Sequence, residues 1–324
     1  MFSSNKKIAV IIPCYLVKDH ILHVIKTLPS FVQLVICVDD GCPEKTGIHI
    51  MDSCDDPRVK VIFHEKNQGV GSAVITGYKK ALSEGAEILV KMDGDGQMPA
   101  SHLPALLYPI LNGHADYTKG NRFFSLDFLQ PMPRIRKFGN AILSFMSKLS
   151  TGYWQMMDST NGFTALNGSL IPYLAIDKIS QRYFFETDLL FRLNILRAVV
   201  IDVPMHAQYH DEKSSLVISK QFGPFLKGHL KNFSKRIFYN YFLRDFSIGS
   251  LSLCVGLVLL LFGLFVGGHA WIQSIETGIV ASSGTVMLSA LPILMGIQFL
   301  MLFLHFDISQ TPKDPIHKYL LTTQ

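Results

Sequence analysis

Cysteine is scarce in this chain, and no long apolar run precedes its first predicted strand. The five cysteines among 324 residues form an odd set without zinc-type spacing, which argues against a disulfide framework and a structural zinc site. Without an apolar leader we expect no cleavable signal peptide. These absences together predict free thiols and a main domain that stays in the cytosol.

Charged residues are absent from one long apolar segment and nearly absent from a second. Segment 246–267 has no formally charged residue, and 284–306 carries only His305. Each would span about 33 Å as a helix, close to the bilayer core of about 30 Å. A buried helix of a soluble protein can be this apolar, but two such segments in a chain of positive mean hydropathy favour a membrane hairpin.

Basic residues gather just before the first apolar segment. Residues 217–245 hold six Lys and Arg against one acid, whereas the 268–283 connection holds Glu276 and neither Lys nor Arg. The positive-inside rule therefore predicts that both chain ends are cytoplasmic. Basic and aromatic residues interleaved in this way are typical of an amphipathic helix on anionic lipid headgroups, although a solvated linker helix is the alternative. The formal charge of +5 follows from this cluster and requires no nucleic acid.

Apolar runs of strand length alternate with segments of helical length in the first 112 residues. The runs cover 7–13, 34–38, 59–63 and 87–92, and 69–82 is one of the helical segments. This alternation predicts an α/β fold with a parallel sheet covered on both faces, in which ligands bind beyond the carboxyl ends of the strands. Residues 113–216 are more mixed, with strands predicted near 117–121, 162–166 and 199–203 and helices near 134–149 and 185–196.

The most informative motif is Asp93-Gly-Asp-Gly-Gln97, which follows the fourth apolar run. Two carboxylates side by side are unfavourable unless a cation or hydrogen bonds neutralise them, and the glycines let the backbone bend so that both can reach one ion. Hard oxygen ligands favour Mg2+ or Mn2+, completed by the oxygens of a bound diphosphate. An ordinary Asp-Gly turn after a strand is the alternative interpretation.

Polar residues also follow the other three runs. Tyr15 follows the first, Asp39-Asp40-Gly41 the second, and His64 to Asn67 the third. Because the carboxyl ends of parallel strands meet at one edge of a sheet, we expect these residues to converge on one crevice. Gly69-Val-Gly-Ser72 would offer backbone N–H groups to a phosphate or sugar, although a simple helix start explains it as well.

These motifs together resemble glycosyltransferase family 2 enzymes of GT-A fold. Within the family the chain is similar to polyprenyl-phosphate glycosyltransferases such as dolichol-phosphate mannose synthase-like enzymes with two C-terminal membrane helices. The resemblance rests on Asp39-Asp40-Gly41, Asn67-Gln-Gly-Val-Gly71, Asp93-Gly-Asp-Gly-Gln97 and Gly120-Asn-Arg122. It implies a GT-A catalytic domain over 1–216, amphipathic juxtamembrane helices over 217–245, and two membrane helices with a short cytoplasmic tail over 246–324.

The resemblance also implies roles for individual residues. Asp39 and Asp40 would hold the nucleoside, and Asp93, Asp95 and Gln97 would bind the metal and the diphosphate. Further substrate-binding candidates are Pro13, Tyr15, Asn67 and Gly71. Arg122 and Arg134 would grip the acceptor phosphate, which suits the guanidinium fork, although membrane-surface contact is the alternative for Arg134.

The chain departs from the family pattern at two places. Pro13-Cys-Tyr15 is followed by Leu-Val-Lys where the family usually continues with Asn-Glu, and Asp19 is a candidate substitute. The basic tail of the catalytic domain reads Glu212-Lys-Ser-Ser215, so Lys213 is kept as a diphosphate partner while the second basic residue is lost.

The expected reaction is attack by the phosphate of a membrane polyprenyl phosphate on the anomeric carbon of a UDP- or GDP-sugar, with inversion. Two alternatives stay open. A transferase acting on a lipid or glycan hydroxyl would need a base, for which Asp188 is the candidate, although an acid in the first turn of a helix needs no such role. A non-catalytic scaffold that binds nucleotide sugars is the other. The sequence leaves open whether the hairpin only anchors the protein or also forms homo-oligomers.

Overall fold

The computed structural model describes residues 5–124, 134–205 and 218–320, apart from the side chains of 134–138, 140 and 218–222. The chain forms two compact units, one of residues 1–233 with 312–324 and one of residues 234–311. The division falls within one helix and returns the tail to the first unit. The predicted boundaries at 216 and 245 differ from it and stay predictions.

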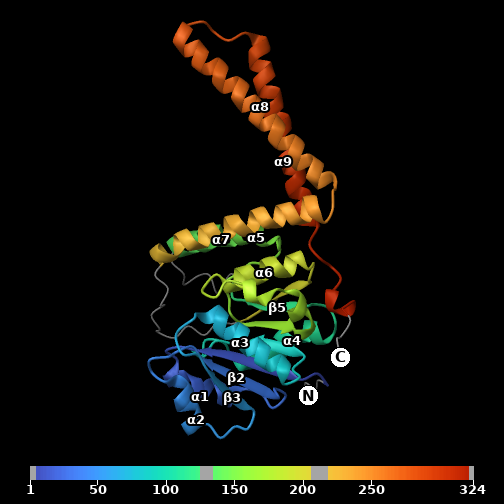
Figure 1. Cartoon of the computed structure of the whole chain (residues 1–324). Coiled ribbons are helices and arrows are strands. Elements are labelled where there is room, and N and C mark those ends of the chain that lie inside the picture. The colour runs from blue at the N-terminus through green and yellow to red at the C-terminus, as the bar shows by residue number, and fades with distance from the viewer. Residues whose placement is uncertain (1–4, 125–133, 206–217, 321–324) are drawn as a thin grey trace. The chain divides into compact units, whose positions relative to one another are not determined.

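A seven-stranded sheet lies at the centre of the first unit, in the order β3-β2-β1-β4-β6-β5-β7 (Figure 1). The strands β3, β2, β1 and β4 are parallel, as the alternating pattern predicted, whereas β6 runs antiparallel to both β4 and β5. The bounds are β1 Ile8–Cys14, β2 Leu34–Asp39, β3 Val59–Phe63, β4 Ile88–Lys91, β5 Tyr117–Asn121, β6 Thr164–Asn167 and β7 Val200–Pro204.

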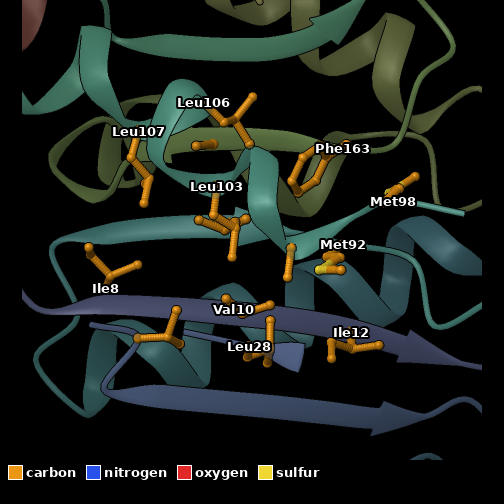
Figure 2. Packing of buried hydrophobic residues seen from close by; sticks show 14 of the residues in the cluster. Ile8, Val10, Ile12, Leu28, Met92, Met98, Leu103, Leu106, Leu107 and Phe163 are labelled. Atoms are coloured by element: carbon orange, nitrogen blue, oxygen red, sulfur yellow. The ribbon is translucent and has the colours of Figure 1, made fainter. Parts of the chain in front are cut away.

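Two apolar cores cover the two faces of this sheet, because side chains alternate along a strand. Ile8, Val10 and Ile12 of β1 belong to the first core, which Figure 2 shows packed against Leu103, Leu106 and Leu107. Ala9 and Ile11 belong to the second core. Helices α1 (Lys18–Thr27), α2 (Thr46–Ser53) and α4 (Leu103–Leu111) contribute to the first core, and α3 (Val70–Ser83) and α6 (Phe185–Ile195) to the second.

The register brings the strand ends named above to one edge of the sheet. Cys14 pairs with Asp39, and Asp39 pairs with Phe63, so β1, β2 and β3 end together. Because β6 is antiparallel, it begins where its neighbours end: Lys91, the last residue of β4, pairs with Thr164. The segments after β4 and β5 and before β6 therefore meet at this edge.

The tail after the second unit packs on the sheet of the first. Its short 3-10 helix, Ile316–Lys318, places two backbone N–H groups on the buried Asp116, at 2.9 Å from Ile316 and 2.8 Å from His317. The His317 ring also contacts Asp116 at 2.7 Å, and Val199 N donates to it at 2.7 Å. Asp116 thus ties the tail to the start of β7.

The second unit is a hairpin of α8 (Ile248–Thr277) and α9 (Ser283–Ser309), both long and apolar enough to cross a membrane. The predicted span 284–306 lies in α9, and the predicted span 246–267 begins two residues before α8. α8 extends further, to a left-handed cap at Gly278 with φ 67°. Gly256, Gly263 and Gly296 lie where the two helices meet, and a Cβ at Gly263 would come within 2.7 Å of the Ser289 carbonyl oxygen.

A buried ion pair joins the end of α7 (Ile218–Phe238) to the end of α9. The Arg236 guanidinium donates to both carboxylate oxygens of Asp307, at 2.6 and 3.0 Å, and the Tyr241 hydroxyl donates to the same carboxylate at 2.6 Å. Arg236 was one of the basic residues counted toward the membrane surface, yet its side chain is buried. Among the side chains of this segment that the structure describes, Lys227, Lys231 and Lys235 are exposed.

Candidate functional site

The predicted metal motif lies directly after β4, at the sheet edge where the strands end. Asp93, Asp95 and Gln97 are all partly exposed. Asp95 accepts a hydrogen bond from Gln97 N at 3.0 Å, which closes the turn, and Gly96 has a φ of 79° that favours glycine. The motif therefore presents two carboxylates and an amide in one tight turn.

Lys91, the last residue of β4, lies beneath this motif. Its ammonium is 2.8 Å from Asp93 Oδ1 and 3.0 Å from Glu186 Oε1 of α6. Burial alone would lower the pKa of Lys91, but the two carboxylates outweigh burial and hold that pKa above its ordinary value. Lys91 is therefore a buried cation with two anionic partners, one of which belongs to the metal motif.

Asp39 and Asp40 are buried where β2 ends, and both carboxylates accept backbone hydrogen bonds. Asp39 accepts from Cys42 N at 2.7 Å and Gly47 N at 2.6 Å. Asp40 accepts from Gln68 N at 2.9 Å and Gly69 N at 2.8 Å. The pair thus fixes the loops after β2 and β3, and its predicted contact with the nucleoside stays a prediction.

The other predicted substrate-binding residues of this half lie around the same loops. Tyr15 is 43% exposed just beyond β1, next to the partly exposed Pro13, and Asn67 is exposed. Gly71 is buried in the first turn of α3, where a Cβ would clash with the Ser180 carbonyl oxygen. Packing against Ser180 therefore accounts for the glycine at position 71. Tyr15 and Asn67 are the exposed residues of this set.

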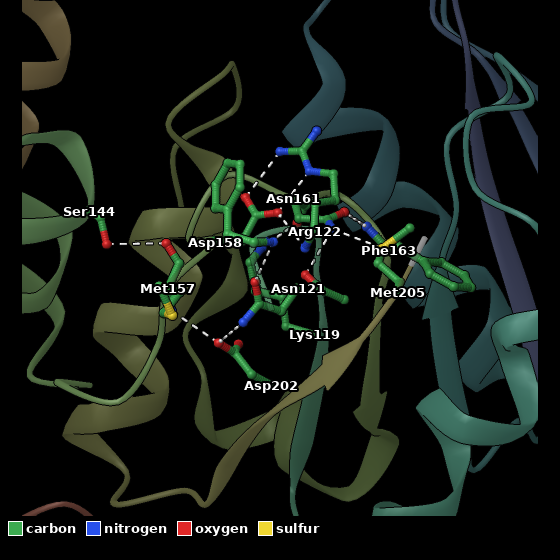
Figure 3. Close-up of polar contacts among 12 residues, drawn as sticks. Lys119, Asn121, Arg122, Ser144, Met157, Asp158, Asn161, Phe163, Asp202 and Met205 are labelled. Atoms are coloured by element: carbon green, nitrogen blue, oxygen red, sulfur yellow. Dashed lines mark hydrogen bonds and ion pairs between the residues drawn. The ribbon is translucent and has the colours of Figure 1, made fainter. Parts of the chain in front are cut away.

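Arg122 lies directly after β5 and is held by Asp158 in a fork geometry. Its Nε donates to Asp158 Oδ2 at 2.7 Å and an Nη donates to Oδ1 at 3.0 Å, as Figure 3 shows. Asp158 is fully buried, whereas the Arg122 side chain is 27% exposed. The pair orients a guanidinium at the sheet edge, and it begins the polar loop 158–162.

The far end of this loop reaches the metal motif. A Cβ at Gly162 would clash with the Lys91 ammonium and with the Asp93 carboxylate, so only glycine leaves room for both. The loop then enters β6 at Thr164, opposite Lys91. One short segment therefore connects the arginine after β5 with the carboxylate after β4.

A second group of polar residues contacts this loop (Figure 3). Asp202 of β7 accepts from Met157 N at 3.0 Å and Asn121 Nδ2 at 3.1 Å, and burial raises the pKa of Asp202 to about 6. Lys119 of β5 donates to the Asn161 carbonyl, and burial lowers the pKa of Lys119 to about 8. These contacts hold the loop at both ends.

Comparison with known proteins agrees with this arrangement. The sequence model of the family described as Glycosyl transferase family 2 matches residues 9–172, about half of the chain. The chain belongs to glycosyl transferase family 2. A UDP-N-acetylglucosamine–dolichyl-phosphate N-acetylglucosaminyltransferase of Methanococcus voltae is 33% identical over 195 residues, which are 56% of this chain and 77% of that protein. An undecaprenyl-phosphate mannosyltransferase of Micrococcus luteus is 30% identical over 173 residues, 53% and 70% of the two chains.

Solved structures show the same fold. Glucosyl-3-phosphoglycerate synthase from Mycobacterium tuberculosis, in complex with Mn2+, UDP and glucosyl-3-phosphoglycerate, matches with a TM-score of 0.52 at 17% identity. The match covers 72% of this chain and 80% of that one. The predicted GT-A fold and the assignment as a glycosyltransferase are therefore confirmed.

Asp188 of this glycosyltransferase does not contact the metal motif. It accepts from Ser180 N at 2.8 Å and from Asn232 Nδ2 at 3.0 Å, and Arg192 lies 3.7 Å away. Glu186, two residues earlier on α6, is the carboxylate joined to the motif through Lys91. The role of Asp188 as a base stays a prediction, and its visible contacts hold α6 against neighbouring segments.

Two predicted residues cannot be placed in the site. Arg134 is the first residue of α5 (Arg134–Thr151), but its side chain lies outside the described part of the structure. Lys213 also lies outside the described residues. Their predicted contacts with the acceptor phosphate and the diphosphate stay predictions. Asp19, the candidate substitute, is exposed in the first turn of α1.

The residues of the motif fit a divalent cation. In the described part of the chain no three His, Cys, Asp or Glu residues form a closed cage. Two carboxylates and an amide in one turn instead suit Mg2+ or Mn2+, which keep positions for substrate phosphate oxygens and water. Asp93 and Asp95 would hold such an ion, with Gln97 beside them.

Sequence reasoning missed Lys91 and Glu186. A lysine within the apolar run Ile88-Leu-Val-Lys-Met92 was the available signal, because a buried ammonium requires an anionic partner. The partner itself gave no such signal, because it lies on a helix far along the chain. Asp202 was likewise hidden inside a short strand.

Proposed function

We propose that this glycosyltransferase moves a sugar from a nucleotide sugar to a membrane polyprenyl phosphate, at the cytoplasmic face and with inversion. The observation that carries the proposal is the fixed Arg122 guanidinium, joined through loop 158–162 to the Asp93 carboxylate. It would set an anion-binding group beside a motif suited to a metal and a diphosphate. The two relatives from Methanococcus voltae and Micrococcus luteus are named as transferases acting on a lipid phosphate, which supports this choice of acceptor.

A phosphate acceptor does not require a side chain that acts as a base. A phosphate monoester has a second pKa near 6 and is largely ionised at neutral pH. Arg122 would bind its oxygens through a guanidinium that Asp158 holds in place, and would orient the attacking oxygen toward the anomeric carbon. No side chain has to remove a proton from the nucleophile.

The donor side would use the motif after β4. Asp93 and Asp95 would hold Mg2+ or Mn2+, which when bound supplies positive charge to the diphosphate leaving group. Asp95 is oriented by the Gln97 backbone and Asp93 by Lys91. These contacts would preorganise the carboxylates before the substrate arrives.

The hairpin would bring the site to a lipid acceptor. An isoprenoid tail leaves the bilayer at a cost of about 0.8 kcal/mol for each exposed CH2, so its phosphate must be met at the interface. The tail contacts between Asp116 and residues 316–317 support an even number of crossings, because both ends of the hairpin return to one folded unit. With the basic segment before α8, the positive-inside rule favours the cytoplasm for that side.

The hydroxyl-acceptor alternative needs a base, and its candidate Asp188 has its two carboxylate oxygens engaged with Ser180 and Asn232. The scaffold alternative gives no reason for the charged groups beneath the motif. We therefore propose the lipid phosphate as acceptor, and the homo-oligomer prediction is left outside this proposal.

The test is a transfer assay on the full-length protein in detergent. Purified protein is mixed with Mn2+ or Mg2+, a panel of radiolabelled nucleotide sugars and a polyprenyl phosphate, and label entering the organic phase is counted. We expect metal-dependent transfer that Asp95→Asn abolishes. Bound donor without label in the lipid for any sugar would contradict the lipid-phosphate acceptor.

Arg122→Met sharpens the assay. Losing one charge-assisted bidentate contact of about 1.5–3 kcal/mol predicts a roughly 10- to 100-fold drop in kcat/KM for the polyprenyl phosphate, with the donor KM little changed. Arg58→Met is the matched control, because Arg58 makes a comparable fork to Asp56 at the opposite edge of the sheet, before β3. It should lower thermal stability and leave the acceptor KM unchanged. Equal effects of both variants on that KM would contradict the role of Arg122.

A further inference from the structure

A positive charge is buried directly beneath the metal motif. Lys91 is 2% exposed, and its ammonium lies 2.8 Å from Asp93 and 3.0 Å from Glu186. An ammonium is costly to bury, and a buried ion pair adds little net stability compared with apolar side chains of similar size. Packing alone would be satisfied by a methionine or leucine at the end of this apolar strand. The charge therefore calls for a functional account.

The surroundings of Lys91 restrict both carboxylates. Gly162 closes the space beside Asp93 and Lys91, since even a Cβ would overlap with both. Glu186 is 8% exposed in the first turn of α6 and is held from below by the same ammonium. The Asp93 side chain is 32% exposed. Its carboxylate is thus fixed by a cation on one side and by a backbone on another.

Lys91 also belongs to a polar row that crosses the sheet. It pairs with Thr164 of β6, Thr164 pairs with Lys119 of β5, and Lys119 pairs with Asp202 of β7. Residues paired directly across strands share one face, and here that face is the one covered by α6. Glu186 interacts electrostatically with both lysines. The charges beneath the motif are therefore one connected set.

We propose that Lys91 and Glu186 are positioning residues that set the charge and orientation of the metal motif. Lys91 holds the Asp93 carboxylate toward the ion and offsets part of its negative charge, and Glu186 in turn offsets part of the charge of Lys91. This proposal rests on the proposed metal-dependent transfer and extends it to two residues that do not touch the substrate.

The proposal predicts effects of opposite sign on metal binding. Lys91→Met removes a cation near the ion, so Mn2+ should bind more tightly, while turnover falls because Asp93 is no longer held. Glu186→Gln removes an anion and leaves Lys91 wholly to Asp93, so Mn2+ should bind more weakly. One charge at this range in a partly buried site corresponds to a change on the order of tenfold in each direction.

The experiment is a titration of the full-length protein in detergent with Mn2+ alone, followed by electron paramagnetic resonance of the free ion. We expect a lower Kd for Lys91→Met, a higher Kd for Glu186→Gln, and a Kd near that of the unchanged protein for the double variant. Turnover should be lower in all three. Lys91→Arg, which keeps the charge, should keep a Kd near that of the unchanged protein.

A purely structural ion pair gives a different result. Both single variants would then lower thermal stability, and Mn2+ binding per folded molecule would be unchanged or weakened in both. Mn2+ binding that is unchanged or weakened in both single variants overturns the proposal, and so does an unsubstituted protein that binds no Mn2+. Lys79→Met, which breaks an exposed pair with Asp177, is the control for loss of a lysine. Opposite Kd changes without any sugar transfer to polyprenyl phosphate would overturn the proposed function and leave this inference standing.

Discussion

The two units of the chain bury charge in different ways. The first unit buries many charged side chains near one sheet edge, among them Lys91, Lys119, Asp158 and Glu186. In residues 234–311, all of which the structure describes, the buried charged side chains are Arg236 and Asp307 alone. The first unit rests on two apolar cores, whereas the hairpin leaves most apolar side chains on its outside.

The difference follows from the surroundings that each unit is built for. In water, apolar burial supplies enough stability to carry a costly charged site inside the fold. In lipid, apolar side chains gain nothing by leaving the solvent, so helices associate through small residues and close backbone contact. The glycines between α8 and α9 fit the second regime. The charged site therefore lies in the unit that two apolar cores stabilise, and the hairpin relies on close packing of its helices.

The largest expected effect comes from breaking the buried pair of Arg236 and Asp307 in the hairpin unit. Asp307→Ala leaves the Arg236 guanidinium buried without the carboxylate that it contacts at 2.6 and 3.0 Å, which predicts a loss of about 3–5 kcal/mol. Thermal unfolding of the full chain in detergent measures it. Arg236→Met combined with Asp307→Leu should recover most of that loss. A double variant as unstable as Asp307→Ala would show that apolar side chains cannot replace the ion pair.

The next effect concerns His229, which belongs to the first unit. Its ring is 3% exposed, lies against Phe184 and contacts the Ser150 hydroxyl at 2.8 Å, and burial lowers the pKa of His229 to about 4. Between about pH 6.5 and 4 the unfolded chain binds a proton that the folded chain does not. The free energy of unfolding therefore decreases as the pH is lowered through this range. The pKa difference corresponds to about 3 kcal/mol.

His229→Gln tests this assignment, because glutamine does not titrate. Thermal melts at pH 7.5 and pH 4.5 should differ less for the variant than for the unchanged chain. If acid lowers the melting temperature of both by the same amount, the acid sensitivity resides in other groups.

The smallest expected effect tests whether Gly263 is needed for the close packing of α8 against α9. Gly263→Ala places a methyl group within 2.7 Å of the Ser289 carbonyl oxygen, which predicts a loss of about 1–3 kcal/mol as α8 and α9 move apart. Gly268→Ala is the matched control on the same helix, because a Cβ there meets nothing within 4 Å. It should be neutral or slightly stabilising. Equal losses in the two variants would contradict the close-packed seam.

The sequence predicts the elements well wherever one local pattern decides them. The strand over 117–121 matches β5, and the apolar run before Asp93 correctly places that motif at a sheet edge. The two spans were predicted from length and lack of charge alone. Their longer extent is set by local capping at Gly278 and Ser282, which a hydropathy argument does not weigh.

The rest depends on contacts between residues far apart in the chain. Nothing near Lys91 in the sequence identifies Glu186 as its partner, because only the packing of α6 on the sheet brings the two together. The antiparallel direction of β6, which brings Gly162 to Asp93, is also decided by tertiary packing. The burial of Arg236 was missed for the same reason, since a basic residue in an amphipathic segment is expected to face outward.

The return of the tail to Asp116 has a consequence for biogenesis. Asp116 lies in the first unit, but its partners at 316 and 317 are translated only after both apolar helices. Until the hairpin has been inserted into the membrane, a nascent chain would therefore hold a nearly complete sheet in which Asp116 keeps its contact with Val199 N but lacks its contacts with the tail. Maturation of the enzyme would then be coupled to insertion, and a ribosome-released fragment that stops before the tail would be open to quality control.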